Sequence, residues 1–598
     1  MPVVPVDNRW SLVVKRDGAE WKDFERADVE RFEWRGALNE PPTGRLVVLI
    51  DSRRDAAPLK LEDCLGKSID VELLPPGRDT FEGESGDLKF AGEGQSATYL
   101  GQSDGRARWE IVFRHKAHRL MQKACCKTWS SGDYDDVKVE DIVRQLLSDA
   151  GLSVKKLESS KLKRNAVLQY RETDFNFLLR LVEDMGCWID FHADTLSDLS
   201  ITRSSRGAGE KLDSDNTLDW ALESAPTPNL LDVIAHPNPK KFRVGAIKET
   251  AKADKAPSKK AFGEMKVVDF DTAISSEDVA KVAAEALVRS MTSPSLRVRA
   301  TANGSCYLPG QEVELDNEFL DGVTSLETTF LVTASEVSFT PEGVTSTFSG
   351  HLRGEDYLPH RRAIRPRIDG VLPAIVVTSD SDVDEHGRIR VKFPWADDDM
   401  SAWVRVAQPW AGKDRGVQFL PHVDDEVLVA FEHGDPSQPI IIGSLHNSEN
   451  TIPTSLSSEW TKSIVKTKAE HLLTFEDKGG EEFVEVLTGI NGHKIRLDDK
   501  DQFIEVTSGG GHTLTLDDMG KKVELKSAGG AELTMDDNSQ TVTIKVGGCS
   551  IEMAPAGITI KATQVTVKGD AKVAVEGAMT EVKGSGMLKL QGGMTMIN

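Results

Sequence analysis

A 19-residue repeat near the end of the 598-residue chain is the feature that most restricts its fold. An apolar residue followed by an aspartate pair recurs three times at this spacing, at Leu497–Asp499, Leu516–Asp518 and Met535–Asp537. Equal spacing of one short motif is typical of proteins built from stacked structural units. The repeat therefore predicts a rod made of similar rungs.

Apolar residues recur at fixed positions around each aspartate pair and alternate with polar ones. Alternation with a period of two indicates strands with one buried face. Each repeat should therefore hold two short strands, with the aspartates and nearby glycines at the corners. We predict a needle core of four columns: Ile495, Leu514 and Leu533; Leu497, Leu516 and Met535; Ile504, Val523 and Val542; and Val506, Leu525 and Ile544.

A single rung is too small to be stable. Burying its four aliphatic side chains supplies at most about 6 to 12 kcal/mol, whereas ordering one repeat costs about 28 kcal/mol at about 1.5 kcal/mol per residue. The missing neighbours could lie along the same chain, as in a single-chain parallel β-helix, or come from other copies wound around a shared axis. Because two such short strands leave little interior, we favour intertwined copies, three in number.

Charge and cysteine content exclude several classes of function. A net charge of -23 argues against nucleic-acid binding, because that function needs an excess of Lys and Arg. The six dispersed cysteines form no C-x-x-C pair, so we expect reduced thiols and neither a zinc site nor a disulfide framework. The first residues lack the features of a signal peptide, and no apolar stretch approaches 18 residues, so we expect no stable membrane insertion.

Residues 1–365 mix strand patterns with helices. One helix should begin at Val139 and end at Gly151, and a second should begin near Asp174, a good N-cap residue, and end at Gly186. A third helix is predicted over about 277–291. The Lys-rich segment 248–262 is interpreted as a mobile loop.

Residues 366–447 contain about five short strand patterns separated by tight turns, which favours a small barrel of the oligonucleotide/oligosaccharide-binding (OB) type. Such barrels often bind nucleic acid, and aromatic side chains lie near basic ones here. Two acidic runs, 397–399 and 424–426, would repel phosphates, so core and subunit-interface positions are the stronger interpretation. The side chains concerned are Trp395, Trp403, Trp410, Phe419, Arg405 and Lys413.

The barrel segment carries a family resemblance, together with part of the region before it. The sequence resembles the valine-glycine repeat (VgrG) spike proteins of contractile injection systems, a family that includes type VI secretion spikes, extracellular particles and phage baseplate hub proteins. The motifs are Pro366–Gly370, Asp384–Phe393, Trp403–Gly412, Gly434–Pro436 with Gly443, and Gln169–Gly186.

The resemblance implies a mainly β fold with four parts. A hub resembling a phage tail hub, with α+β character, would occupy residues 1–365, an OB-fold collar 366–447, a linker 448–470 and a trimeric intertwined β-helix needle 471–598. Family needles often end in a flat tip that receives a PAAR-type protein, and the matching residues here are Met594, Met596, Ile597 and Asn598. Methionines in this region could instead fill a narrow rod core.

The implied function is that of a structural spike. A homotrimer would cap the inner tube, organise the baseplate proteins, puncture the target envelope and deliver cargo effectors. The resemblance implies assembly in the bacterial cytoplasm, followed by export through contraction or release with the particle.

Catalytic chemistry finds no support in the sequence. We find no G-x-S-x-G, H-E-x-x-H or P-loop pattern, so we predict no catalytic, metal or cofactor-binding residue. His422, His433 and His446 match no metal motif, and the repeated aspartates are better explained as turn formers than as calcium ligands. Two alternatives stay open: a spike that carries a cell-wall hydrolase activity, and a receptor-binding tail protein.

Overall fold

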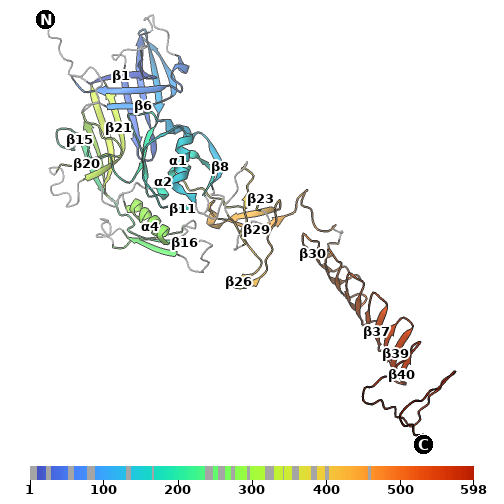
Figure 1. Ribbon diagram of the computed structural model, residues 1–598. Coiled ribbons are helices and arrows are strands. Elements are labelled where there is room, and N and C mark those ends of the chain that lie inside the picture. The colour runs from blue at the N-terminus through green and yellow to red at the C-terminus, as the bar shows by residue number, and fades with distance from the viewer. Residues whose placement is uncertain are drawn as a thin grey trace, which may run out of the picture. The chain divides into compact units, whose positions relative to one another are not determined.

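The computed structural model describes residues 10–21, 29–51, 60–76, 88–129, 137–164, 167–209, 211–235, 247–252, 263–270, 277–292, 296–316, 329–340, 342–352, 363–378, 387–396, 403–455 and 459–597. The chain forms two compact units, residues 1–447 and 448–598. Strands dominate both units, which confirms the predicted mainly β class (Figure 1). Within the described residues, no helix is both long and apolar enough to cross a membrane.

A 12-stranded sheet forms the largest part of the first unit. It encloses two apolar cores, one around Phe32 and Phe113 and one around Tyr307 and Phe348. Its alternating strands turn one apolar face inward, as the period of two requires. The strands, in spatial order, are β15 (Thr217–Ser224), β19 (Leu296–Asn303), β22 (Gly343–Leu352), β21 (Thr329–Thr340), β3 (Val29–Ala37), β4 (Glu40–Asp51), β7 (Arg106–Arg114), β6 (Leu88–Ser103), β5 (Ser68–Leu74), β1 (Ser11–Arg16) and β2 (Ala19–Glu20), with β20 (Glu312–Glu314) beside β21.

Two helices, α1 (Val139–Asp149) and α2 (Asp174–Asp184), pack together around a separate apolar core. Both end as predicted, because Gly151 and Gly186 adopt left-handed φ values of 61° and 69° that terminate a helix. The N-cap of α2 is Thr173 and not Asp174, since the Thr173 hydroxyl accepts a hydrogen bond of 3.1 Å from the Asn176 amide.

Short strands surround these helices. They are β8 (Ala124–Trp129), β9 (Val137–Lys138), β10 (Ser153–Leu157), β11 (Lys163–Arg164), β12 (Val167–Thr173), β13 (Trp188–Phe191) and β14 (Asp198–Thr202). A three-stranded sheet of β16 (Leu230–Ala235), β17 (Ile247–Lys252) and β18 (Lys266–Phe270) lies against α4 (Glu277–Thr292). The structure thus places residues 248–252, interpreted as part of a mobile loop, in β17, and residues 253–262 lie outside the described residues.

The barrel segment forms a five-stranded sheet of β24 (Val391–Lys392), β23 (Leu372–Val376), β28 (Glu426–Phe431), β29 (Pro439–Leu445) and β25 (Arg405–Val406). An isolated antiparallel bridge between Ile389 and Val404 connects the first edge strand to the last. Five strands closed in this order form a small barrel of the OB kind. A two-stranded arm, β26 (Ala411–Gly412) and β27 (Arg415–Gly416), extends from it (Figure 1).

The second unit contains one antiparallel sheet of eleven strands, here called the repeat sheet. Successive strands pair in chain order, so the sheet is an antiparallel meander and not a single-chain parallel β-helix. It begins at Lys462, inside the range predicted as a linker. The strands are β30 (Lys462–Lys466), β31 (Leu472–Glu476), β32 (Phe483–Leu487), β33 (Lys494–Asp498), β34 (Phe503–Thr507), β35 (Thr513–Asp517), β36 (Lys522–Lys526), β37 (Ala531–Asp536), β38 (Thr541–Val546), β39 (Cys549–Ala554) and β40 (Gly557–Lys561).

Candidate functional site

One face of the repeat sheet is lined by two continuous columns of apolar side chains, here called the apolar face. Each strand contributes two side chains that pair directly with those of the next strand, and Ser463 is the single polar member. The first column is Val465, Leu473, Val486, Ile495, Val506, Leu514, Leu525, Leu533, Ile544, Ile551 and Ile560; the second is Ser463, Phe475, Val484, Leu497, Ile504, Leu516, Val523, Met535, Val542, Met553 and Ile558.

All twelve residues predicted as needle core lie on the apolar face. The four predicted columns merge into two, because antiparallel pairing sets Ile495 beside Val506 and Leu497 beside Ile504. In the single chain these side chains are only partly covered: Leu514 is 38% exposed and Leu525 is 49% exposed.

The opposite face of the sheet is polar along its centre, whereas apolar side chains lie on it near some strand ends: Leu472, Leu487, Phe483 and Phe503. Its central column contains Arg496 between Glu485 and Glu505, and threonines further along. Arg496 lies 3.5 Å from Glu485, and its guanidinium stacks over the Phe483 ring at 3.8 Å. Side chains that satisfy one another in this way are suited to face water.

The predicted aspartate corners are confirmed at one edge of the sheet. The carboxylates of Asp498, Asp517 and Asp536 each accept backbone hydrogen bonds from residues two or three positions further on, at 2.6–3.1 Å. The second aspartate of each pair donates its backbone N–H to a carbonyl of the turn before it, as Asp518 does to Gln502 at 3.0 Å. The first aspartate therefore shapes a turn, and the second connects it to its neighbour.

At the other edge, here called the histidine edge, turns stack closely. Each turn begins with a Thr or Ser whose hydroxyl accepts the backbone N–H of the residue that ends the turn, as Ser508 does from His512 at 3.0 Å. The next residue must be small in two turns: a Cβ on Gly489 would lie 2.1 Å from the Ala469 carbonyl oxygen, and one on Gly509 would lie 1.7 Å from that of Asn491. Glycine at these positions allows two backbones to touch.

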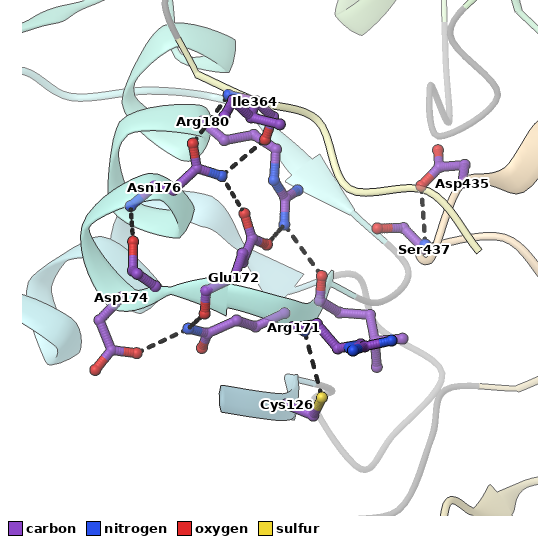
Figure 2. Close-up of polar contacts among 12 residues, drawn as sticks. Cys126, Arg171, Glu172, Asp174, Asn176, Arg180, Ile364, Asp435 and Ser437 are labelled. Carbon is purple, nitrogen blue, oxygen red and sulfur yellow. Dashed lines mark hydrogen bonds and ion pairs between the residues drawn. The ribbon is translucent and has the colours of Figure 1, made fainter. Parts of the chain in front are cut away.

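In the first unit, a buried polar network connects α2, β12 and the segment that leads into the barrel; we call it the joint. Glu172 receives hydrogen bonds of 2.6 Å from both Arg180 and Asn176. Asn176 also brackets Ile364, donating to its carbonyl at 2.7 Å and accepting from its N–H at 2.9 Å. Figure 2 shows the Glu172 carboxylate between Asn176 and Arg180, with Ile364 above them. Asp184 adds ion pairs with Arg164 and Arg365.

The joint also contributes to the barrel core. Leu168 of β12 is buried in the cluster formed by the barrel strands, and Tyr170 packs on Trp395 with a ring-centroid distance of 5.6 Å. Arg171, between these residues and Glu172, adopts a left-handed φ of 48° where the β12–β8 pairing is irregular. A bulge of this kind re-aims the side chains on either side of it. The motif Gln169–Asp174 thus joins helix, linker and barrel.

The aromatic residues suspected of base stacking do not form one platform. Trp403 is buried, Trp395 is partly buried against Phe393 and Tyr170, and Trp410 and Phe419 are exposed on the arm and beside it. The structure therefore divides them between core and surface, which confirms the core interpretation for Trp403, and the subunit-interface interpretation stays a prediction.

The residues predicted to dock a tip protein lie in the segment after β40. The side chains of Met594, Met596 and Ile597 are 80–86% exposed, and Asn598 lies outside the described residues. Residues 562–597 form no strand in the single chain. Both interpretations of the terminal methionines, tip docking and rod filling, therefore remain predictions.

Within the described ranges, no group of three or more His, Cys, Asp and Glu side chains is arranged to hold a metal ion. His422 and His446 lie in exposed turns of the barrel segment, and His433 lies in a short 3-10 turn. Burial lowers the pKa of His115 to about 4 and raises the pKa of Cys187 to about 11, so both are kept neutral at pH 7. These groups serve packing: the His115 ring contacts Phe191 and bonds the Asp198 carbonyl.

A large sheet domain with packed helices, a five-stranded barrel and a repeat sheet, in this order, define a protein of the tail hub class. The chain belongs to the phage tail baseplate hub (GPD) family, which matches residues 35–342. Residues 372–446 match the type VI secretion system/phage-baseplate injector OB domain, the segment that forms the observed barrel.

Curated relatives are VgrG proteins. The chain is 27% identical over 519 residues to the type VI secretion system spike protein VgrG1b of Pseudomonas aeruginosa, a match that covers 79% of this chain and 64% of that protein. The chain thus spans less than two thirds of that relative. It is also 34% identical over 157 residues to the actin cross-linking toxin VgrG1 of Vibrio cholerae, which covers 24% of this chain and 14% of the toxin.

A solved structure confirms the fold at larger distance. A chain of the Francisella PdpA–VgrG complex in its lidded form superposes with a TM-score of 0.53 at 11% identity, covering 84% of this chain and 81% of that one. The family models and the curated relatives confirm the resemblance to VgrG-type spikes that the sequence motifs indicated.

Proposed function

We propose that three copies of this chain assemble into the structural spike and hub of a contractile injection system. The hub caps the inner tube and organises the baseplate proteins, and the repeat sheets of three copies close into one needle that punctures a target envelope. Family membership supports the hub role, and the VgrG relatives support the spike role.

The observation that carries this proposal is the partly exposed apolar face. Its side chains are mostly about 40% exposed, and fully burying one large aliphatic side chain contributes about 2 kcal/mol, so completing their burial adds about 0.8 kcal/mol each. Summed over both columns this gives about 15 kcal/mol per copy, an upper value because unfolded chains are already partly compact. A contiguous apolar surface of this size in a soluble protein marks an interface.

Three copies fit the shape of this face. Each strand presents only two apolar side chains to this face. Three sheets can therefore enclose a narrow apolar core, with the opposite face of each sheet turned toward water. The closed arrangement has few free strand edges, which suits a stiff rod. The thrust itself would come from contraction of the particle.

We further propose that the chain acts without catalysis of its own. Its partners would be two further copies, the inner tube, baseplate proteins, a PAAR-type tip protein docked at Met594–Asn598, and cargo effectors. Assembly would take place in the bacterial cytoplasm, with export by contraction or release with the particle. The absence of recognisable catalytic patterns supports a structural role, and turnover of peptidoglycan by the purified chain would contradict it.

The oligomeric state tests the proposal directly. Leu514→Asn places a polar side chain on the apolar face, whereas Thr515→Asn makes a similar change one residue later on the polar face. We expect mass photometry to show a trimer for the native chain and Thr515→Asn, and a weakened trimer for Leu514→Asn. A native monomer, a native dimer or equal behaviour of the two variants would overturn the three-copy needle.

Function in the particle is tested by deleting residues 448–598, the second compact unit. We expect the shortened protein to keep a folded first unit, shown by its circular dichroism and protease resistance, while a translocation assay in the producing bacterium loses effector delivery. Unchanged delivery without the repeat sheet would contradict the role of needle.

A further inference from the structure

Three consecutive turns of the histidine edge share one hydrogen bond between neighbouring turns. The Nδ1 atom of a histidine that ends one turn accepts the backbone N–H near the start of the next turn. The pairs are His471 with Gly489 at 3.2 Å, His493 with Gly509 at 3.0 Å, and His512 with Ala528 at 3.2 Å. Repetition of one contact in three turns marks a built feature of the sheet edge.

This bond depends on the protonation state of the imidazole. A backbone N–H can only donate, so Nδ1 must carry a lone pair, and the neutral ring then holds its proton on Nε2. When the ring is protonated, both nitrogens become donors, and Nδ1 and the backbone N–H repel each other. Histidine is the side chain that ordinarily changes charge between about pH 5 and pH 8. Each of the three bonds is therefore lost when its ring gains a proton.

The charged groups near the three histidines form ion pairs with one another. The strand ends that flank the four turns present Lys466, Lys494 and Lys526 as cations and otherwise neutral Leu, Thr or Ala side chains. Lys468 adds a further cation within the first turn. The acidic groups are already engaged with these lysines: Glu470 with Lys466, Glu505 with Lys494, and Glu524 and Glu532 with Lys526, at 2.7–3.7 Å.

We propose that the three histidines make the stacking of these turns sensitive to acid. At neutral pH their hydrogen bonds connect four successive turns: 467–471, 488–493, 508–512 and 527–531. Once the rings are protonated at lower pH, these hydrogen bonds between turns are lost. The contacts lie within one chain, so the proposal does not depend on how many copies form the needle.

The acid-sensitive stretch ends at a defined position. Ala531 stands where the earlier turns have histidine, although Ser527 still accepts its N–H at 2.9 Å. The next turn at this edge, Gly547–Gly548, has only two residues between its strands and carries no histidine. The turns after Ala531 thus serve as an internal reference for the turns that contain histidine.

Amide hydrogen exchange of the full-length protein, read by mass spectrometry, tests the proposal. Labelling at pH 7.5 and pH 5.5 uses times scaled for the intrinsic pH dependence of exchange. We expect peptides containing Gly489, Gly509 and Ala528 to exchange about 2- to 10-fold faster at pH 5.5 beyond this scaling, the range for one lost hydrogen bond. In peptides that cover the turns after Ala531, the exchange rate should change only as the intrinsic pH scaling predicts.

Substitution identifies the responsible group. The variant in which His471, His493 and His512 are all alanine should show the fast exchange at both pH values, and His493→Ala alone should show it only at the turn that contains Gly509. If the exchange rates of all turns in the native protein change between pH 7.5 and pH 5.5 only by the intrinsic pH dependence, the proposal is overturned. Extra exchange at pH 5.5 that persists at the Gly509 turn of His493→Ala, relative to pH 7.5, would assign the effect to another group and overturn it as well.

Discussion

Gly509 and Gly510 are neighbours in one turn but differ sharply in the space around them. A Cβ at Gly509 would lie 1.7 Å from the Asn491 carbonyl oxygen, whereas the nearest atom to a Cβ at Gly510 is 3.8 Å away. Ordinary van der Waals contact begins near 3.4 Å, so Gly509→Ala must push the two turns apart by about 1.7 Å. The overpacking costs about 1 to 3 kcal/mol, and loss of the bond to His493 adds about 0.5 to 1.5 kcal/mol.

We therefore expect Gly509→Ala to destabilise the second unit by about 2 to 4 kcal/mol per chain, which lowers the melting temperature of a unit this size by about 5 to 15 °C. Gly510→Ala should change it by less than about 2 °C, because neither glycine has the left-handed φ that disfavours alanine. Calorimetric melting of the full-length variants measures both values. Equal melting temperatures would refute the argument that close turn stacking determines the residue at this position.

Two further predictions concern the first unit. Glu172→Gln should lower the free energy of unfolding of this unit by about 3 to 5 kcal/mol, because the buried Arg180 loses its counter-charge. The control Arg144→Gln breaks an exposed ion pair with Glu140 and should cost less than about 0.5 kcal/mol. Urea titration measures both values. The lowered pKa of His115, about 4 in the folded protein, means that the unfolded chain binds more protons below about pH 6.5. Stability present at pH 7 should thus fall by up to about 3 kcal/mol as the pH drops from about 6.5 to about 4, and His115→Gln should flatten this dependence; a native unit with the same stability at pH 7 and pH 4.5 would contradict the assignment.

Sequence patterns predicted the parts of this protein whose determinants are local. The period of two placed every predicted core residue on one face of the repeat sheet, and Gly151 and Gly186 ended their helices as expected. The sequence could not predict that four columns would merge into two, because that depends on where each turn reverses the chain. In hairpins the register is fixed by the type and length of the turn.

Competition between neighbouring residues explains a local error. Thr173 and Asp174 are both good N-cap residues, and the choice is decided by tertiary contacts. The Asp174 carboxylate is occupied by Gln169 at 2.8 Å and by the Cys125 thiol at 3.2 Å, which leaves the Thr173 hydroxyl to cap the helix. The Lys-rich composition of residues 248–252 likewise concealed a strand that forms by pairing with β16.

The joint was recognised in the sequence only as a family motif. No periodicity indicated that Leu168, about two hundred residues before the barrel, would be buried among the barrel strands. Contacts of such long sequence separation leave no local pattern in the sequence. The left-handed conformation of Arg171, which helps to orient these side chains, is not indicated by any sequence pattern either.

The shared core at the joint limits how such proteins can exchange parts in evolution. In a sequence alignment, a recombination point in the segment 363–368 separates hub from barrel, yet it would leave the barrel with the Leu168 and Tyr170 of a foreign hub. A mismatched pair of side chains there would open a cavity or a clash in the barrel. Exchange is better tolerated at a boundary between compact units, such as the one after Asn447. The second compact unit should therefore be exchanged between related proteins more freely than the barrel.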